Sequence, residues 1–310
     1  MKIACFGECM VELSGQPLQR TFGGDTLNTA LYLARLGRQR DIHVSYATAL
    51  GVDTISQDML AAWQKEHIDT RMVRQLPHKL PGLYLVETEP NGVRHFHYWR
   101  NDSAAKFYFA DFSSPLEQAI DKHALDVLYI SGVSLAILAE EAKAVLVTLL
   151  DKHRQHGGKV IFDNHFRPQL WTAKQAQYWY SQVMPFVDIA LISENDEQRI
   201  WGEAAQDAMV ARYQFAGCEE VVIKRGAAPC IVSSQLQSAQ PHVSHVAVNY
   251  VENVVDTSAA GDAFAAGYLA CRLSGGSATS AAELGHQLAA IVLQHPGAII
   301  PLQAMKALLQ

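Results

Sequence analysis

The last quarter of the chain opens with the segment Asp256-Thr257-Ser258-Ala259-Ala260-Gly261-Asp262. We expect a β-strand to end at Val254-Val255-Asp256, and the small residues 263–273 to form a helix directly after the turn. Small side chains let a ligand approach the backbone, and free N–H groups at a helix start bind anions. The segment therefore predicts an anion site where a strand passes into a helix.

Asp262 lies in the first turn of the predicted helix, and its role has two interpretations. A carboxylate at this place is stabilised by the helix dipole alone, so it can be purely structural. It can also be a reactive group beside the anion site. The segment by itself leaves both interpretations open.

Towards the amino terminus, short apolar runs alternate with helical patterns. The predicted strands are 3–7, 44–49, 125–130, 159–163, 188–192 and 220–224, and the predicted helices are 26–36, 56–66, 140–156, 173–184, 205–216 and, after the turn, 278–294. Several strands are apolar throughout, which indicates burial on both faces. The alternation predicts an α/β fold with a mostly parallel sheet, whose ligands bind beyond the carboxyl ends of the strands.

Two stretches interrupt the alternation. Residues 12–22 are polar and irregular, and residues 83–89 and 92–100 read as two strands joined by the turn Pro90-Asn91-Gly92. We expect these stretches to form a small β-sheet that projects from the body. No linker or internal repeat is visible, so residues 1–310 are expected to form one domain.

Composition excludes several classes of protein. Hydrophobic residues make up 49% of the 310 residues, charged residues 18%, and the net charge is −6, so neither disorder nor nucleic-acid binding is expected. No apolar run reaches the roughly 20 residues of a membrane helix, and the first strand soon meets Glu8 and Glu12, unlike a signal peptide. The five scattered cysteines form no CxxC pair, which is typical of a reducing cytoplasm and argues against a structural zinc site.

The segment 256–262 resembles the second signature of the PfkB (ribokinase-like) family of carbohydrate kinases, with matches at Asp256, Ala259-Ala260, Gly261-Asp262, Ala266 and Gly267. Gly23-Gly24-Asp25-Thr26-Leu27-Asn28 is similar to the first signature of that family. The two signatures lie in the family's order, and the resemblance covers essentially all 310 residues. It implies a ribokinase-like fold, in which helices flank the sheet and a β-sheet lid is formed by about residues 11–24 and 82–108.

The resemblance implies that Asp262 is the general base that takes the proton of a substrate hydroxyl. The backbone amides of Ala259, Ala260, Gly261 and Asp262 would bind the transferring phosphoryl group, although the family often has Gly where this chain has Ala259. ATP would further contact Lys224, Arg225, Gly226 and Ala227, whereas the simpler interpretation is a solvated lysine before a turn. Mg²⁺ would be held through water by Asp196, with Glu194 or Glu197 as substitutes, because the family's Asn-x-x-Glu motif is altered here.

Three segments resemble the 2-keto-3-deoxygluconate kinases of the family, namely 24–28, residues 80–84 together with 98–100, and 163–168. They imply sugar contacts by Gly24, Asp25, Thr26, Leu27, Asn28, Tyr84, Tyr98, Trp99, Arg100, Arg167 and Asp262, and ATP contacts by His165, Phe166 and Arg167. Whether His165 contacts nucleotide or substrate stays open. A further acidic contact of these kinases is missing at 295–298.

Strand alternation adds an independent argument. Phe96, Tyr98 and Arg100 fall on one face of a strand, where an aromatic platform with a guanidinium suits an acidic sugar. The partners implied are therefore a sugar acid and MgATP, with no nucleic acid and no membrane, and the hairpin offers a surface for a homo-oligomer. Other interpretations are a fructokinase or ribokinase type of enzyme, and a non-catalytic sugar-binding regulator. A dinucleotide-dependent dehydrogenase is disfavoured, because the first strand leads into Gly7-Glu8-Cys9-Met10 and not GxGxxG.

Overall fold

A computed structural model describes residues 1–88 and 94–309. Within them, one nine-stranded sheet runs in the order β13 (His242–Val246), β12 (Cys230–Ser234), β11 (Glu220–Lys224), β10 (Ile189–Ser193), β9 (Lys159–Asp163), β8 (Val127–Ser131), β1 (Lys2–Phe6), β4 (His43–Leu50) and β5 (Val73–Gln75). From β11 to β5 along this order, neighbouring strands pair in parallel. Strand β12 pairs antiparallel with both of its neighbours, β11 and β13. The predicted α/β architecture with a mostly parallel sheet is confirmed.

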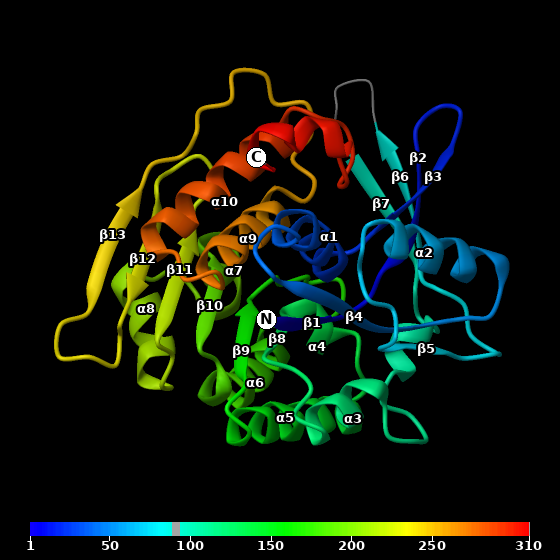
Figure 1. The fold of residues 1–310 in the computed structure, drawn as a ribbon, viewed down its shortest axis with the longest axis horizontal. Coiled ribbons are helices and arrows are strands. Elements are labelled where there is room, and N and C mark those ends of the chain that lie inside the picture. The colour runs from blue at the N-terminus through cyan, green and yellow to red at the C-terminus, as the bar shows by residue number, and fades with distance from the viewer. Residues whose placement is uncertain (89–93, 310) are drawn as a thin grey trace.

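Helices cover both faces of this sheet (Figure 1). One face packs against α1 (Asp25–Gly37), α2 (Thr54–Lys65), α9 (Ala260–Arg272) and α10 (Ala278–Leu293). The other packs against α3 (Pro115–Asp121), α4 (Gly132–Ala136), α5 (Glu140–Gln155), α6 (Ala173–Val183), α7 (Glu194–Trp201) and α8 (Gln206–Phe215). Alternate residues of β1 serve the two cores, since Ile3 and Cys5 face α1 while Ala4 and Phe6 face the other layer. Short 3₁₀ turns at Ala104–Phe107, Met184–Phe186 and Leu302–Leu308 complete the structure.

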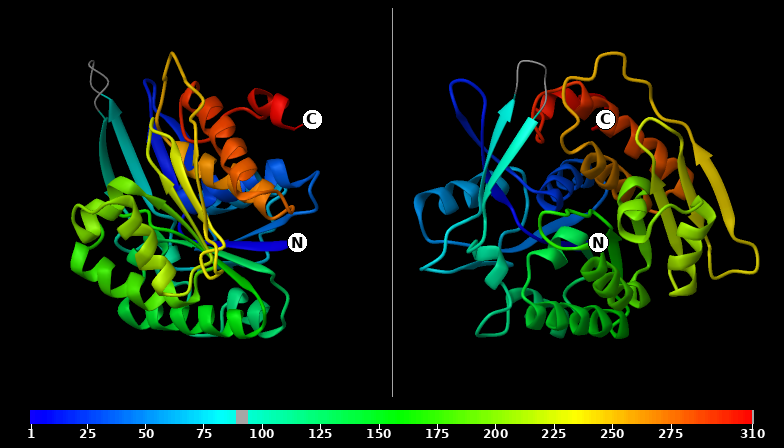
Figure 2. Two further views of the ribbon diagram at one scale, coloured as in Figure 1. Left: turned by 90° about the vertical axis from the view of Figure 1, so that its left-hand side faces the viewer. Right: turned by 180° about the vertical axis from the view of Figure 1, so that it is seen from behind.

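A second, four-stranded sheet stands at the side of the body (Figures 1 and 2). Its order is β3 (Gln19–Gly23), β2 (Met10–Ser14), β6 (Leu83–Thr88) and β7 (Arg94–Trp99). Strands β6 and β7 are antiparallel, as the hairpin prediction requires, and β2 joins the two hairpins by pairing in parallel with β6. The expected turn Pro90-Asn91-Gly92 lies outside the described residues. The stretch 12–22, expected to be irregular, contributes most of β2 and β3.

One predicted strand is absent from the part of the chain that the structure describes. Residues 254–256 are not in a strand, although Val254 and Val255 favour one by propensity. Both valines are about half exposed, and the Val255 amide donates to the Leu293 carbonyl at the end of α10 instead of to a strand. The segment therefore belongs to the irregular connection from β13 to α9, and α9 begins at Ala260, three residues earlier than predicted. None of the described helices contains an apolar stretch long enough to cross a membrane.

Candidate active site

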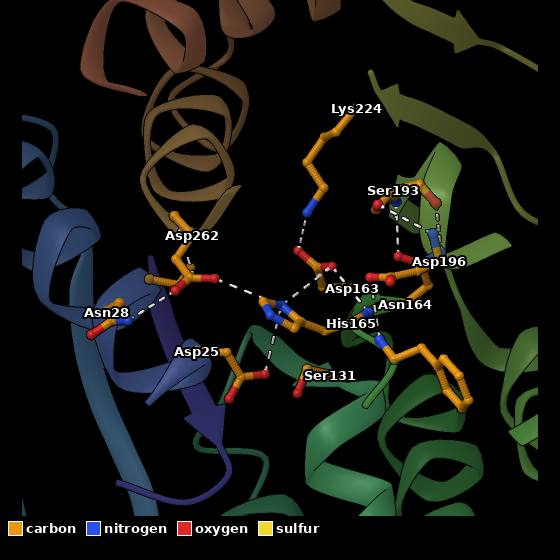
Figure 3. Close-up of polar contacts among 12 residues, drawn as sticks. Asp25, Asn28, Ser131, Asp163, Asn164, His165, Ser193, Asp196, Lys224 and Asp262 are labelled. Atoms are coloured by element: carbon orange, nitrogen blue, oxygen red, sulfur yellow. Dashed lines mark hydrogen bonds and ion pairs between the residues drawn. The ribbon is translucent and has the colours of Figure 1, made fainter. Parts of the chain in front are cut away.

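The two motifs at opposite ends of the sequence meet at the carboxyl edge of the large sheet (Figure 3). Asn28 of α1 donates from Nδ2 to Asp262 Oδ2 of α9 over 2.8 Å, and both residues are about 95% buried. Helices α1 and α9 pack against each other, and this bond joins their amino-terminal turns. The arrangement brings the amide of Asn28 and the carboxylate of Asp262 into one polar pocket.

Asp262 is the ionisable group at the centre of this pocket. Burial, helped by the negative charges of Asp25 and Asp163, raises its pKa to about 7, against the bond from Asn28 and the charge of Lys224. A carboxyl with a pKa near neutrality can accept a proton readily at physiological pH. The environment thus favours the catalytic over the purely structural interpretation of Asp262.

The turn before α9 is held by Asp256. Its two carboxylate oxygens accept from the Ser258 amide at 2.8 Å and the Gly297 amide at 2.7 Å. Ala259 follows as the helix N-cap with φ of 57°, a left-handed conformation that a β-carbon disfavours. The first amides of a helix lack partners within the helix, so those of α9 are available as donors at this turn.

Lys224, at the end of β11, extends over this helix start. Its Nζ donates to Asp163 Oδ2 over 2.5 Å, and a β-carbon built on Gly261 would lie 3.9 Å from the same Nζ. Lys224 is therefore a buried, paired cation beside the amides of α9, not a solvated one. The helix amides and the ammonium form a site suited to an anion.

The neighbouring residues after β11 differ in their surroundings. Arg225 Nε lies 3.3 Å from Glu194 Oε1, while Gly226, with φ of 60°, and Ala227 are exposed in the turn. The left-handed φ explains why the turn has glycine at this position. These residues follow β11 at the same edge of the sheet.

The segment after β9 contributes one residue to the pocket and one to its rim. His165 lies between Asp25, Asp163 and Asp262, whereas Arg167 is exposed (Figure 3). The Phe166 side chain is buried in the core beneath and only its amide, which donates to Asp196 Oδ2 over 3.3 Å, faces this region.

Residues 24–28 divide between pocket and core. Gly24 is the N-cap of α1 and packs against the Glu8 carbonyl, and burial raises the pKa of Asp25. Thr26 and Leu27 are fully buried, and the Thr26 hydroxyl bonds the Tyr46 hydroxyl, so their side chains serve the core. Asp25 Oδ2 and Asn28 Oδ1 have no hydrogen-bond partner among the described residues, which leaves two buried acceptors in the pocket.

The small sheet presents an aromatic surface. The Tyr84 ring lies 5.8 Å from the Tyr98 ring, which stacks on Phe96 with Arg100 on the same face, as the alternation predicts. Trp99 points to the opposite face and is 60% exposed. Tyr84 donates its hydroxyl hydrogen to Glu12 of β2, which ties the two hairpins together.

Glu8, whose carbonyl lies against Gly24, is a buried carboxylate that the sequence interpretation did not single out. It is 1% exposed, its Oε2 accepts from Arg100, and its Oε1 lies against Gly82 without a hydrogen-bond partner among the described residues. The pair joins the end of β1 in the body to the end of β7 in the small sheet, 92 residues apart. No local pattern distinguishes Glu8 from an ordinary carboxylate after a strand, so only the tertiary structure identifies it.

The proposed metal residues are engaged with protein partners. Asp196 accepts from Phe166, Glu194 bonds Arg225 and Gln206, and the buried Glu197 bonds Asn164, Arg212 and Tyr213. Among residues 1–88 and 94–309 no three acidic, histidine or cysteine side chains are grouped as ligands of one metal ion. Asp196 and Glu197 both reach the segment of His165, through the Phe166 amide over 3.3 Å and the Asn164 side chain over 3.2 Å, but Glu197 is also bonded to Arg212 and Tyr213.

The sequence profile described as pfkB family carbohydrate kinase matches residues 1–305. The chain belongs to this family. It is 49% identical to the 2-dehydro-3-deoxygluconokinase of Dickeya dadantii, over 98% of both chains, and 47% identical to that of Escherichia coli K12, over 99% of both. The crystal structure of a protein assigned as ribokinase II from E. coli, in complex with ATP and Mg²⁺, shares the fold with a TM-score of 0.83 and 20% identity, covering 99% of this chain and 98% of that one.

Proposed function

We propose that this family member is an ATP-dependent sugar-acid kinase, which phosphorylates the 6-hydroxyl of 2-keto-3-deoxygluconate (2-dehydro-3-deoxygluconate) to give 2-keto-3-deoxy-6-phosphogluconate. The observation that carries the proposal is Asp262, a buried carboxyl with a pKa of about 7 at the start of α9, bonded to Asn28 and adjacent to a site for an anion. The near full-length identity to 2-dehydro-3-deoxygluconokinases supports the substrate.

In the proposed reaction the 6-hydroxyl oxygen attacks the γ-phosphorus of ATP, and the bond from that phosphorus to the bridging oxygen of ADP breaks. Asp262 takes the hydroxyl proton. The amides of residues 259–262 and the ammonium of Lys224 stabilise the charge on the transferring group, which is the main contribution a protein makes to phosphoryl transfer.

Mg²⁺ enters this scheme as part of the MgATP substrate. Carboxylate oxygens are ligands that suit Mg²⁺ and its bound waters. Asp196, with its carboxylate near the segment of His165, is the residue we assign to the water shell of the ion, and no step of the transfer is assigned to it.

Arg100 and Arg167 are the cations proposed for the substrate carboxylate. Arg100 already donates to Glu8, which uses one guanidinium nitrogen and fixes its plane, while a guanidinium has five N–H donors in all. Asp25 and Asn28 offer the unpartnered acceptors Oδ2 and Oδ1 to sugar hydroxyls. We assign Tyr84 and Tyr98 to the aromatic side of the sugar site.

We also propose a cytoplasmic location, where ATP is available, and a homo-oligomer that uses the small sheet. Strand β7 is an edge strand of that sheet, and it exposes Trp99 on the face opposite Tyr98. An edge strand with exposed aromatic side chains favours pairing with another copy.

The test of the function is ATP consumption over a panel of sugar acids and neutral sugars. We expect a clear preference in kcat/KM for 2-keto-3-deoxygluconate, and no comparable ATP consumption by the Asp262→Asn variant. A wild type that prefers fructose or ribose would refute the substrate and leave only the family. Binding of the sugar acid without ATP turnover would indicate a regulator.

A further inference from the structure

His165 lies at the point where three carboxylates from different elements meet (Figure 3). Its Nδ1 is 3.7 Å from Asp262 Oδ1, 3.9 Å from Asp25 Oδ2 and 4.0 Å from Asp163 Oδ1. Only 15% of its side chain is exposed. The imidazole is therefore the shared neighbour of the candidate base and the two other acids of the pocket.

Arg167 determines which imidazole nitrogen carries the proton. Its guanidinium nitrogen lies 2.6 Å from His165 Nε2. A guanidinium can only donate, so Nε2 must be the acceptor of this bond. The single proton of the neutral imidazole then resides on Nδ1, which faces the three carboxylates.

The imidazole is neutral at physiological pH. Burial and the positive charges of Arg167 and Lys224 lower the pKa of His165 well below its usual 6.5. A second proton on Nε2 would also point directly at the Arg167 donor. At 3.7 to 4.0 Å the three approaches are longer than hydrogen bonds, so the Nδ1–H group acts on the carboxylates as a neutral dipole that faces them, and not as the partner in an ion pair.

Asp262 is the carboxylate best placed to receive this donor. Its Oδ2 is bonded to Asn28, and its Oδ1 is the carboxylate oxygen nearest to Nδ1. Asp163 already receives Lys224 over 2.5 Å, which balances its charge. A donor directed at a carboxylate favours its ionised form.

We propose that His165 is a positioning residue, which directs its Nδ1 proton to Asp262 and so keeps the base ionised and oriented, while Arg167 fixes the imidazole tautomer. This role rests on the proposed function, in which Asp262 accepts the substrate proton. The titratable and charged groups that surround His165 are Asp25 of α1, Asp163 of β9, Asp262 of α9, Lys224 of β11, Arg167 of the following loop and, bonded to Asp163, Tyr129 of β8.

Two variants of nearly equal shape separate this role from packing. In His165→Asn the amide nitrogen can occupy the place of Nδ1 and still donate, whereas His165→Leu fills the same space without a donor. The measurement is the dependence of kcat/KM on pH between 5 and 9, with saturating MgATP and 2-keto-3-deoxygluconate as the varied substrate. Its acidic limb reports the base of the enzyme–MgATP complex to which the sugar acid binds.

We expect the acidic limb of His165→Leu to lie about one pH unit higher than in the wild type, which is a tenfold loss at pH 6 that fades by pH 9. His165→Asn should keep the wild-type limb. An unshifted limb in His165→Leu, an equal loss at all pH values, or the same shift in both variants would overturn the proposal.

The tautomer provides a readout that needs neither activity nor a variant. Long-range ¹H–¹⁵N spectroscopy of the wild type should show His165 neutral and protonated on Nδ1 at pH 7. Protonation on Nε2 would overturn the proposal. If the wild type phosphorylates a neutral sugar instead, the proposed substrate fails, while the pH comparison made on that sugar still tests His165.

Discussion

Asp262 is a buried carboxyl, and the proposed reaction requires its ionised form, which burial disfavours. This conflict has a measurable consequence for the stability of the fold. The pKa of Asp262 is raised from 3.8 to about 7 in the folded protein. A raised pKa means that its contribution to stability is complete below about pH 4 and is lost as the pH rises towards 7. An ionised Asp262 therefore destabilises the fold at neutral pH.

The Asp262→Asn variant should then be more stable than the wild type at neutral pH. We expect the difference in free energy of unfolding to be near zero at pH 4, to grow by about 1.4 kcal/mol per pH unit, and to level off above pH 7 at no more than about 4 kcal/mol. Urea unfolding at a series of pH values measures this. A difference that does not change with pH would show that Asp262 is not the buried acid described here.

The same variant should lose most of its activity, because the amide keeps the shape of the side chain but cannot take a proton. General-base loss typically costs about 10²- to 10⁴-fold in kcat, and ATP affinity should change little. Steady-state kinetics and ATP titration provide the two readouts. A variant that keeps more than about a tenth of the wild-type kcat would remove Asp262 from the chemistry, since the smallest expected loss is larger.

Arg100 requires a test that respects its partner. Arg100→Ala alone leaves Glu8 buried and unpaired, which costs about 3–5 kcal/mol of stability. Comparing Glu8→Gln with Glu8→Gln/Arg100→Ala removes the guanidinium without leaving that charge. We expect the preference for sugar acid over fructose, as the ratio of kcat/KM values, to fall about 10- to 150-fold between these two proteins. Equal losses on both sugars would mean that Arg100 only joins the small sheet to the body.

The residues of the site differ in how far sequence reasoning could find them. Asp262 belongs to a segment with a local physical signature, a helix start beside small residues, whereas Asn28 was reached only through the family resemblance, and the structure brings the two into contact. Neither Glu8 nor Arg100 stands out from the sequence around it. Their importance is visible only in the structure, where they form an ion pair although 92 residues separate them in the sequence. Thr26 and Phe166 lie in segments that line the pocket, but their own side chains are buried in the core. The sequence of a short segment does not determine which of its side chains face the core, because that depends on how the segment packs.

At the scale of elements, the parallel strands and their helices could be predicted because apolar runs on both faces of a sheet leave a clear pattern. The strand expected at 254–256 was wrong for a physical reason. The strand propensity of valine has little effect where no neighbouring strand is available for pairing. The Val255 amide instead donates a hydrogen bond to the Leu293 carbonyl at the end of α10. Strands β12 and β13 were missed because no helix separates them from β11 or from each other, so they do not follow the alternation of strands and helices by which the parallel strands were predicted.

The turn into α9 offers a prediction at this scale. Ala259 has a left-handed backbone conformation, which costs a non-glycine residue roughly 1–2 kcal/mol. Replacing it by glycine removes this strain, but it also lowers the stability of the folded state by about 0.4–1 kcal/mol, because glycine gives the unfolded chain more conformational entropy. Ala259→Gly should therefore stabilise the protein by about 0.5–1 kcal/mol. Ala270→Gly, inside α9, is the control and should destabilise it by a similar or larger amount. Thermal unfolding distinguishes them, and destabilisation by both changes would contradict the strain at Ala259.

For the molecule as a whole, the fold joins parts that no local segment contains. The large sheet sets the helix starts and strand ends at one edge, and the small sheet reaches this edge through the Glu8–Arg100 pair. Since Arg100 belongs to the small sheet and Asp262 to the body, a substrate held by both residues would contact both parts at once. The small sheet is then the part of the molecule whose mobility should respond to the sugar.

Hydrogen exchange tests this coupling between the sugar and the small sheet. At a sugar-acid concentration 100 times its Kd, amides of β6 and β7 that exchange only when the sheet leaves the body should slow by up to about 100-fold, because exchange then requires release of the ligand. The Asp262→Asn variant should give the same protection, since it keeps the binding surface and lacks only the base. ATP alone should protect the edge near Lys224 and α9 and leave β6 and β7 unchanged. Protection by the sugar acid that is confined to residues after 256 would show that the small sheet does not cover the substrate, and the aromatic face of Tyr84 and Tyr98 would then belong to contacts between copies of the protein.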